Sequence, residues 1–203
     1  MFPFQKYEFK KRSPQWVDAG TAIRKINKGK RILIGSGCAE PQMLVKALVK
    51  NASCFRDNEI VHLLTVGIAP YTDSQYADSF RHNAFFIGKN VRDAVNEGHA
   101  DYIPIFLSEI PMLFKTGQMP IHAALVQVSP PNDNNEVSLG VSVDINTGPD
   151  DNGVIGMAVC SHQHGGDAHA QTYQCDAANM MHAPPPLKMS RLLCDTTRTE
   201  SSG

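Results

Sequence analysis

Residues 31–41 read RILIGSGCAEP and hold the signals of one structural unit. The run Arg31-Ile32-Leu33-Ile34 is apolar and contains β-branched residues, which predicts a short buried strand. The glycines of Gly35-Ser36-Gly37 end that strand, and Pro41 is well placed to open a helix. A strand, a glycine loop and a helix in this order are the repeating unit of an α/β sheet.

The same alternation continues along the next hundred residues. Helices are expected from Pro41, from an Asn90 cap to Gly98, and from a Ser108 cap to Gly117. Apolar runs predict strands over 60–66, 84–87, 102–107, 123–128 and, with weaker alternation, 137–143. Because these strands are apolar on both faces, the sequence predicts an α/β fold with an open, mostly parallel sheet and helices on both faces.

One more helix is expected before this unit. Ser13 suits the N-cap position, and Pro14 suits the first helical position. Apolar residues then recur at helical spacing, at Trp16, Ala19, Ile23 and Ile26. The expected stop of this helix is Asn27-Lys28-Gly29.

Composition narrows the function classes. The chain has 203 residues and a formal charge of −1 at pH 7, so it shows no electrostatic footprint for nucleic acid or an anionic membrane. No run of about 18 apolar residues is present, and the N-terminus lacks the apolar core of a secretory signal. Five irregularly spaced cysteines fit reduced thiols. We expect a cytoplasmic protein without a nucleic-acid or membrane partner.

Aromatic residues are distributed unevenly. Of the 15 aromatic residues, 14 lie in residues 1–146, and Tyr173 alone lies beyond them. A segment with so few large apolar groups does not offset the entropy of ordering its backbone. We therefore divide the chain into a folded domain, 1–146, and a tail, 147–203, in which no helix or strand is expected.

The glycine loop Gly35-Ser36-Gly37 has two readings on its pattern alone. At the carboxyl end of a strand, glycines let a ligand approach the backbone, and free amides at the next helix start favour an anion or oxyanion. A tight turn between strand and helix also needs small residues. The pattern is neither a dinucleotide fingerprint nor a phosphate-binding P-loop, because it lacks a third glycine and a Gly-Lys-Ser/Thr sequence.

Five blocks of sequence, in order, carry a resemblance to a known family. The chain resembles the N-terminal part of acetyl-CoA hydrolase/transferase proteins, which include acetate, butyrate and 4-hydroxybutyrate CoA-transferases of the class I superfamily. The blocks are residues 21–44, with KGKRILIGSG and Glu40-Pro41, 82–88 (HNAFFIG), 98–111 (GHADYIPIFLSEIP), 124–131 (ALVQVSPP) and 138–144 (SLGVSVD). Two departures are His122, where the family often has aspartate, and the Asn-rich turn 132–135. We interpret His122 as an ordinary strand-edge residue.

The resemblance implies a reaction that moves coenzyme A from an acyl thioester to another carboxylate. In such enzymes a glutamate attacks the thioester, and an enzyme-bound CoA thioester follows. The resemblance places that glutamate in a second α/β domain, beyond residue 146. We assign the catalytic role to none of the local candidates: Glu40 is expected to lie at a helix start, Glu109 in a cap, and Glu136 in a turn.

The resemblance also implies what the first domain contributes, namely one wall of the active-site cleft. The expected ligands are a coenzyme A thioester and a short-chain carboxylate, both as substrates, with no bound cofactor and no metal. We nominate two loops as the substrate-binding residues, Gly35, Ser36 and Gly37 together with Ser138, Leu139 and Gly140.

The resemblance ends after Asp144, within the family pattern. The tail contains Cys160, His162, His164, His169, Cys175, His182 and Cys194, but their spacings match no standard zinc site. Clustered Cys, His and Pro after an abrupt break are typical of out-of-frame translation. We expect the tail to be a frameshift product or a disordered segment.

Three functions remain open at this stage. The chain is the first domain of a CoA-transferase or acetyl-CoA hydrolase, inactive without its second domain. Alternatively, it is a CoA-binding module or subunit that pairs with a separately encoded catalytic domain. The third reading is a non-functional truncated product with an exposed interdomain face.

Overall fold

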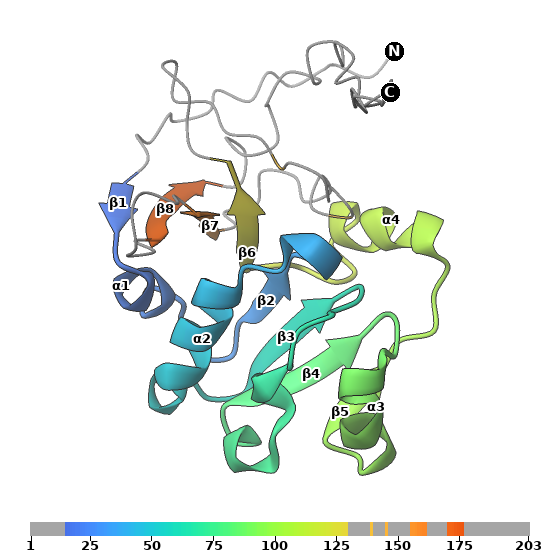
Figure 1. Ribbon diagram of the computed structural model, residues 1–203. Coiled ribbons are helices and arrows are strands. Elements are labelled where there is room, and N and C mark those ends of the chain that lie inside the picture. Colours follow the sequence, from blue (N-terminus) through green and yellow to red (C-terminus); the bar gives the residue numbers. More distant parts are fainter. Residues whose placement is uncertain (1–14, 130–138, 140–144, 146–154, 162–169, 177–203) are drawn as a thin grey trace, which may run out of the picture.

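The computed structural model describes residues 15–129, 139, 145, 155–161 and 170–176, which build an eight-stranded sheet (Figure 1). Its strands are β1 (Gln15–Val17), β2 (Arg31–Ile34), β3 (Asn58–His62), β4 (Phe80–Ala84), β5 (Ala100–Tyr102), β6 (Ala123–Val128), β7 (Ile155–Ser161) and β8 (Ala170–Asp176). Its helices are α1 (Ala19–Ile23), α2 (Gln42–Lys50), α3 (Lys89–Asn96) and α4 (Ile110–Lys115), with short 3-10 turns between them.

Parallel pairing dominates the sheet. The strand order is β1-β8-β7-β6-β2-β3-β4-β5. All pairs from β7 to β5 are parallel, whereas β8 runs antiparallel to β7 and β1 runs antiparallel to β8. The predicted α/β fold with an open, mostly parallel sheet is confirmed.

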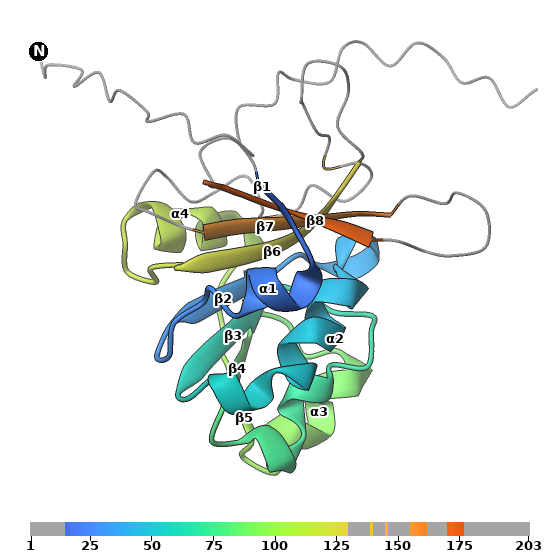
Figure 2. The same ribbon diagram turned by 90° about the vertical axis from the view of Figure 1, so that its left-hand side faces the viewer.

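Strand β2 shows why helices are needed on both faces. Ile32 and Ile34 pack into a core shared with α1, α2 and α3. Leu33, between them, packs into a second core with Ile110 and Phe114 of α4. Successive strand residues point to opposite faces, so a strand with three apolar residues in a row must be covered on both faces. Figure 2 shows α2 on one side of the central strands and α4 on the other.

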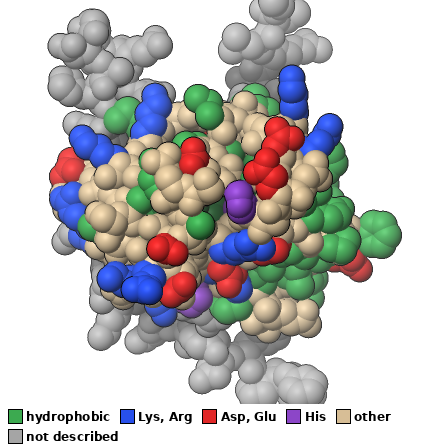
Figure 3. All heavy atoms as spheres, turned by 90° about the horizontal axis from the view of Figure 1, so that it is seen from below, with side chains coloured by type: hydrophobic (Ala, Val, Ile, Leu, Met, Phe, Trp, Pro, Cys, Tyr) green, Lys and Arg blue, Asp and Glu red, His purple; other side chains and the backbone are tan. Residues whose placement is uncertain are grey.

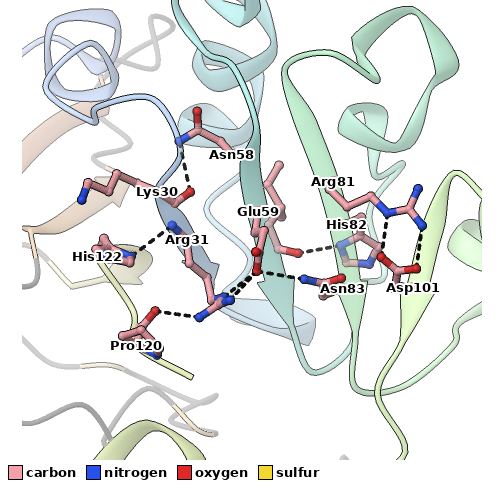
Figure 4. Close-up of polar contacts among 11 residues, drawn as sticks. Lys30, Arg31, Asn58, Glu59, Arg81, His82, Asn83, Asp101, Pro120 and His122 are labelled. Atoms are coloured by element: carbon pink, nitrogen blue, oxygen red, sulfur yellow. Dashed lines mark hydrogen bonds and ion pairs between the residues drawn. The ribbon is translucent and has the colours of Figure 1, made fainter. Parts of the chain in front are cut away.

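Strands β2 and β6 have the predicted boundaries, whereas β3, β4 and β5 both begin and end earlier than predicted, and β4 and β5 share only one residue each with the predicted strands. Their polar residues lie within the strands and pair across the sheet (Figure 4). Arg31 of β2 forms an ion pair of 2.6 Å with Glu59 of β3, which also accepts from Asn83 Nδ2 at 3.1 Å. Arg81 donates two hydrogen bonds of 2.6 Å to Asp101 and lowers the pKa of that carboxyl. Cross-strand partners therefore replace the apolar pattern that marks β2.

The prediction of a helix that begins at Ser13 is wrong. Residues 15–17 form β1, and the helix begins only at Ala19. The Asp18 carboxylate accepts from the Thr21 amide at 2.9 Å, which makes Asp18 the N-cap. Residues 15–17 pair with β8 at the edge of the sheet. A prediction from local spacing alone does not include these backbone partners.

Two strands lie in the tail, where no helix or strand was expected. β7 pairs with β6 over its length, and β8 pairs with β7. Residues 155–160 read IGMAVC, an apolar run that suits the hydrogen-bonding edge β6 would otherwise leave open. The expected strand at 137–143 and most of the tail lie outside the described residues, and the domain boundary near residue 146 stays a prediction.

The end of the molecule opposite the carboxyl ends of the strands is polar. Seen from below, it shows basic and acidic side chains interspersed, while hydrophobic side chains gather toward one side (Figure 3). Among the described residues, no helix is both long and apolar enough to cross a membrane.

Two histidines are buried in the core on the α2 face of the sheet. His62 of β3 and His82 of β4 stack with ring centroids 4.2 Å apart, and the Tyr71 ring lies 5.5 Å from that of His82. His82 Nδ1 lies 3.1 Å from the Ile60 carbonyl oxygen. Burial lowers the pKa of His82 to about 4, and burial together with the neighbouring His82 lowers the pKa of His62 well below its ordinary value. Both rings are therefore neutral at pH 7.

This burial predicts a loss of stability in mild acid. The pKa of His82 is lower in the folded state than in the unfolded state, so the unfolded state binds more protons as the pH falls below about 6.5. We expect the free energy of unfolding to fall by on the order of 2 kcal/mol between pH 7 and pH 5 through this residue. Urea unfolding followed by circular dichroism measures it.

The variant His82→Gln should show a shallower pH dependence, because the titrating group is gone. The matched control is His99→Gln, which changes a partly exposed histidine. Equal pH dependence in the wild type and His82→Gln would contradict the assignment.

Candidate functional site

The order of the strands creates one point at which the chain changes direction across the sheet. From β2 the chain adds β3, β4 and β5 on one side and then returns to place β6 on the other side of β2. The loops that leave β2 and β6 therefore diverge at their carboxyl ends. In open α/β sheets a crevice at such a switch point is where ligands bind. The predicted glycine loop, residues 35–37, leaves β2 at this point (Figure 1).

The backbone of the glycine loop is held by both neighbouring strands. The Gly35 amide donates to the Leu125 carbonyl of β6 at 2.9 Å, and the Gly37 amide donates to the Leu64 carbonyl after β3 at 2.9 Å. These two amides are engaged within the protein. The free amides were expected at the next helix start, and that expectation stays a prediction. Gly37 has a φ of 59°, a left-handed conformation that strongly favours glycine.

Ser36 faces inward, and its nomination as a substrate-binding residue stays a prediction. Its side chain is buried, and its Oγ accepts from the Leu63 amide at 3.3 Å. Ser36 thus connects the glycine loop to the segment after β3, which we call the β3 loop (residues 63–69). The next residue but one, Cys38, is exposed. Of the loop side chains near this point, Ser36 is therefore buried and Cys38 is exposed.

Glu40 has a different role from the predicted one. The N-terminus of α2 has no side-chain cap, so Glu40 is not the first-turn carboxylate expected there. Its side chain is buried and turns toward the β3 loop, where it accepts from the Thr65 hydroxyl and from the Gly67 amide. Burial, and then the charge of Glu40, raise the pKa of Tyr71 well above its ordinary value.

Sequence reasoning missed the residues of the β3 loop altogether. Asn90, expected to cap α3, instead follows the Gly88 cap and donates its side-chain amide to the Thr65 and Gly67 carbonyls. The only available signal in the sequence was that the predicted strand 60–66 ends at Gly67. This glycine marks the end of a strand but does not reveal which side chains contact the loop. Side chains from the loop before α2 and from the first turn of α3 therefore converge on this loop in a way that spacing along the chain does not show.

The second nominated loop is described only in part. Leu139 is partly buried and packs against the core on the α4 face. Ser138 and Gly140 lie outside the described residues, so the nomination of this loop stays a prediction. Glu136 lies outside them too.

Of the remaining candidates, Glu109 lies directly before α4 and makes no side-chain cap hydrogen bond, whereas His122 has a structural partner. His122 Nδ1 accepts from the Arg31 amide at 3.2 Å, and burial followed by the charges of Lys30 and Arg31 lowers its pKa. It lies at the amino end of β6, as its interpretation as a strand-edge residue required. Within the part of the chain that the structure describes, no three His, Cys, Asp or Glu residues are arranged to hold a metal ion. His162, His164, His169, His182 and Cys194 lie outside that part.

Comparison with known proteins identifies the domain. The family model of the acetyl-CoA hydrolase/transferase N-terminal domain matches residues 5–148. The 4-hydroxybutyrate coenzyme A transferase of Clostridium kluyveri is 44% identical over 128 residues, which are 63% of this chain and 30% of that protein. The succinyl-CoA:acetate/propanoyl-CoA:succinate CoA transferase of Fasciola hepatica is 37% identical over 137 residues, 66% of this chain and 28% of that protein. The chain thus spans less than a third of these relatives.

Solved structures agree on the fold. RipA from Yersinia pestis superposes with a TM-score of 0.57 at 22% identity, over 66% of this chain and 34% of that one. A 4-hydroxybutyrate CoA-transferase from Porphyromonas gingivalis superposes with a TM-score of 0.55 at 20% identity, over 82% of this chain and 38% of that one. At these identities the two structures support the α/β fold and nothing finer.

The conformation of Gly37 predicts a specific cost of adding a side chain. Gly37→Ala places a Cβ on a left-handed residue, and we expect the free energy of unfolding to fall by about 1–2 kcal/mol. Gly29→Ala is the matched control, because Gly29 has a φ of 66°, precedes the amino end of β2, and has open space where its new Cβ would lie. Urea unfolding should show a similar loss in both variants. A neutral or stabilising Gly37→Ala would contradict the left-handed conformation.

Proposed function

Because this chain belongs to the acetyl-CoA hydrolase/transferase family, we propose that its α/β domain forms one wall of the substrate site of an acyl-CoA:carboxylate CoA-transferase or acetyl-CoA hydrolase. The observation that carries the proposal is the position of the glycine loop at the carboxyl end of β2, between β6 and β3. The proposed substrates are short-chain acyl-CoA thioesters and acids such as acetate. The name of one relative contains 4-hydroxybutyrate and coenzyme A, and the name of the other contains succinyl-CoA, propanoyl-CoA and acetate.

The residues of this chain would bind and orient rather than react. Gly37 has no side chain and is only partly buried, so a thioester would approach its backbone closely, whereas Gly35 is buried. The hydrogen bonds to Leu125 and Leu64 hold the backbone of both glycines in place. A preformed site of this kind lowers the entropy lost when substrate and acceptor meet. The nominated residues of the second loop, 138–140, would lie on the same wall.

The two glutamates held most firmly within the sheet and its loops are poorly suited to act as the nucleophile. Glu40 is bound by Thr65 and Gly67, and Glu59 is bound by Arg31 and Asn83. A carboxylate with such partners is stabilised as a structural group and is a weaker nucleophile than a free one. We propose that the nucleophile is supplied from the part of the relatives' length that this chain does not span.

A second function, a subunit that pairs with a catalytic domain, is favoured by one observation. Large apolar side chains are exposed in the segments that follow β3, β4 and β5, namely Val66, Ile68, Phe86, Phe106 and Leu107. Exposed apolar groups that cluster at one edge mark contacts with another protein surface. In that case the same edge would meet both substrate and partner.

Turnover tests the division of roles. We expect the purified 203-residue chain to transfer no CoA from acetyl-CoA to propionate and to hydrolyse no acetyl-CoA above the buffer rate, because the proposed nucleophile lies outside it. Chromatographic separation of the CoA esters measures both reactions. Turnover that disappears in Glu109→Gln would contradict the proposal and identify a nucleophile within this chain.

Binding tests the proposed wall directly. We expect acetyl-CoA to bind the chain weakly and Gly37→Ala to weaken that binding at least about tenfold, a loss of about 1.4 kcal/mol, because a Cβ obstructs the approach to the backbone. Gly29→Ala should bind as the wild type does, although it loses similar stability. Isothermal titration calorimetry at millimolar acetyl-CoA measures the affinities. Equal affinities in all three proteins would remove the glycine loop from the site.

A further inference from the structure

The β3 loop presents two apolar side chains to solvent from a rigidly bonded backbone. Val66 is 71% exposed and Ile68 is 85% exposed, while Thr65 and Ala69 on either side are buried. Apolar residues of this size are usually exposed singly and in mobile loops. Here the two exposed residues lie between two buried ones, in a loop at the carboxyl end of β3 and beside the glycine loop.

Three elements hold this loop. The Gly37 amide of the glycine loop donates to the Leu64 carbonyl at 2.9 Å. Asn90, in the first turn of α3, donates to the Thr65 and Gly67 carbonyls. These contacts fix the carbonyls of the loop, whereas the Gly67 amide and the Thr65 hydroxyl bind a third group, the carboxylate of Glu40.

Glu40 is the unusual member of this set because it is a carboxylate with 5% exposure. Burying a carboxylate is costly unless hydrogen-bond donors compensate. The two donors here both belong to the β3 loop and both reach Oε2, while the buried Oε1 has no hydrogen-bond partner among the described residues. One carboxylate oxygen, Oε2, accepts from the Thr65 hydroxyl and, at 3.2 Å, from the Gly67 amide. The loop after β2 and the loop after β3 are thereby joined through a single charged group.

Gly67 is shaped to accept this carboxylate. A Cβ at Gly67 would lie 2.8 Å from both carboxylate oxygens of Glu40 and 2.7 Å from Gln42 Nε2. The exposed Gln42 side chain has room to move, but the buried Glu40 carboxylate does not. The buried position of the Glu40 carboxylate therefore requires that residue 67 has no side chain.

We propose that Glu40 is a positioning residue that fixes the β3 loop and so aims Val66 and Ile68 at the substrate edge of the sheet. That the two side chains face an acyl-CoA substrate rests on the proposed function; that Glu40 sets the loop conformation does not. Glu40 acts through Thr65 and Gly67 and is not a catalytic residue.

Amide hydrogen exchange of Gly67, followed by NMR, tests the positioning role in the full chain. Glu40→Leu removes Oε2, the acceptor that the Thr65 hydroxyl and the Gly67 amide share. The Gly67 amide keeps Thr65 Oγ1 as an acceptor at 3.0 Å, but Glu40 then no longer holds that hydroxyl, so we expect exchange at Gly67 to accelerate about 10- to 100-fold, the usual effect of losing a hydrogen bond to a charged group. Glu40→Gln keeps an oxygen that accepts from the same two donors, and should restore slow exchange. Exchange at Ile60 and Val61 in β3 should change much less, which separates the local effect from global destabilisation.

The matched control is Glu59→Leu, which removes a glutamate of β3 whose partners are Arg31 and Asn83. In this variant, amide exchange at Gly67 should accelerate no more than amide exchange in β3. Gly67→Ala is a second test, because the added Cβ displaces the loop while Glu40 is intact. We expect fast amide exchange in the residues next to position 67 of this variant. The double variant Gly67→Ala/Glu40→Leu should exchange no faster at these residues than Gly67→Ala alone. Slow exchange at Gly67 in Glu40→Leu, or fast exchange in Glu40→Gln, would overturn the positioning role.

Acetyl-CoA titrations of the same proteins separate the two hypotheses. An affinity that falls about tenfold in Glu40→Leu and returns in Glu40→Gln supports both. If Glu40→Leu frees Gly67 but the wild type shows no acetyl-CoA binding, the positioning role stands and the proposed function fails. If acetyl-CoA binds equally well to the wild type and Glu40→Leu while Gly67 is freed, Val66 and Ile68 do not face the substrate and that half of the proposal is wrong.

Discussion

The pairing of β2 with β3 on one side and β6 on the other is the constraint on which the rest of the structure depends. It makes β2 an interior strand, which explains why Ile32, Leu33 and Ile34 are all buried and why helices cover both faces. It also brings the loops after β2 and β3 to the same edge. The glycine loop, Glu40 and the β3 loop meet because their strands are parallel neighbours, although Glu40 and Gly67 lie far apart along the chain.

The local sequence pattern was sufficient to predict the elements whose structure depends on apolar residues. It was insufficient for the elements that depend on polar partners from other strands. β2, β6, the ends of α3 and α4, and the α/β class follow from apolar runs and glycine stops. The early starts of β3 and β4 do not, because Glu59 and Arg81 are stable in strands only through partners on other strands. The direction of the Glu40 side chain was equally hidden, since proximity to Pro41 suggests a helix cap and only the folded sheet brings Thr65 and Gly67 within reach.

The edge at the carboxyl ends of the strands combines rigidity with exposure. Its backbone groups are bonded between loops, and Gly37 and Ala69 are both held at positive φ, which costs free energy that the surrounding contacts must offset. At the same edge several large apolar side chains remain exposed. The amino ends of the strands, by contrast, are tied by ion pairs such as Arg31–Glu59. Under the proposed function this asymmetry has a chemical meaning, because a thioester and its acceptor acid would meet at a preformed edge.

The most direct test of that meaning is a crystal structure of the chain grown with acetyl-CoA. The thioester end of the ligand should lie against the backbone of residues 35–37, with Val66 and Ile68 beside it. Acetyl-CoA bound instead at the amino ends of the strands, near Arg31 and Glu59, would contradict the assignment of the substrate edge.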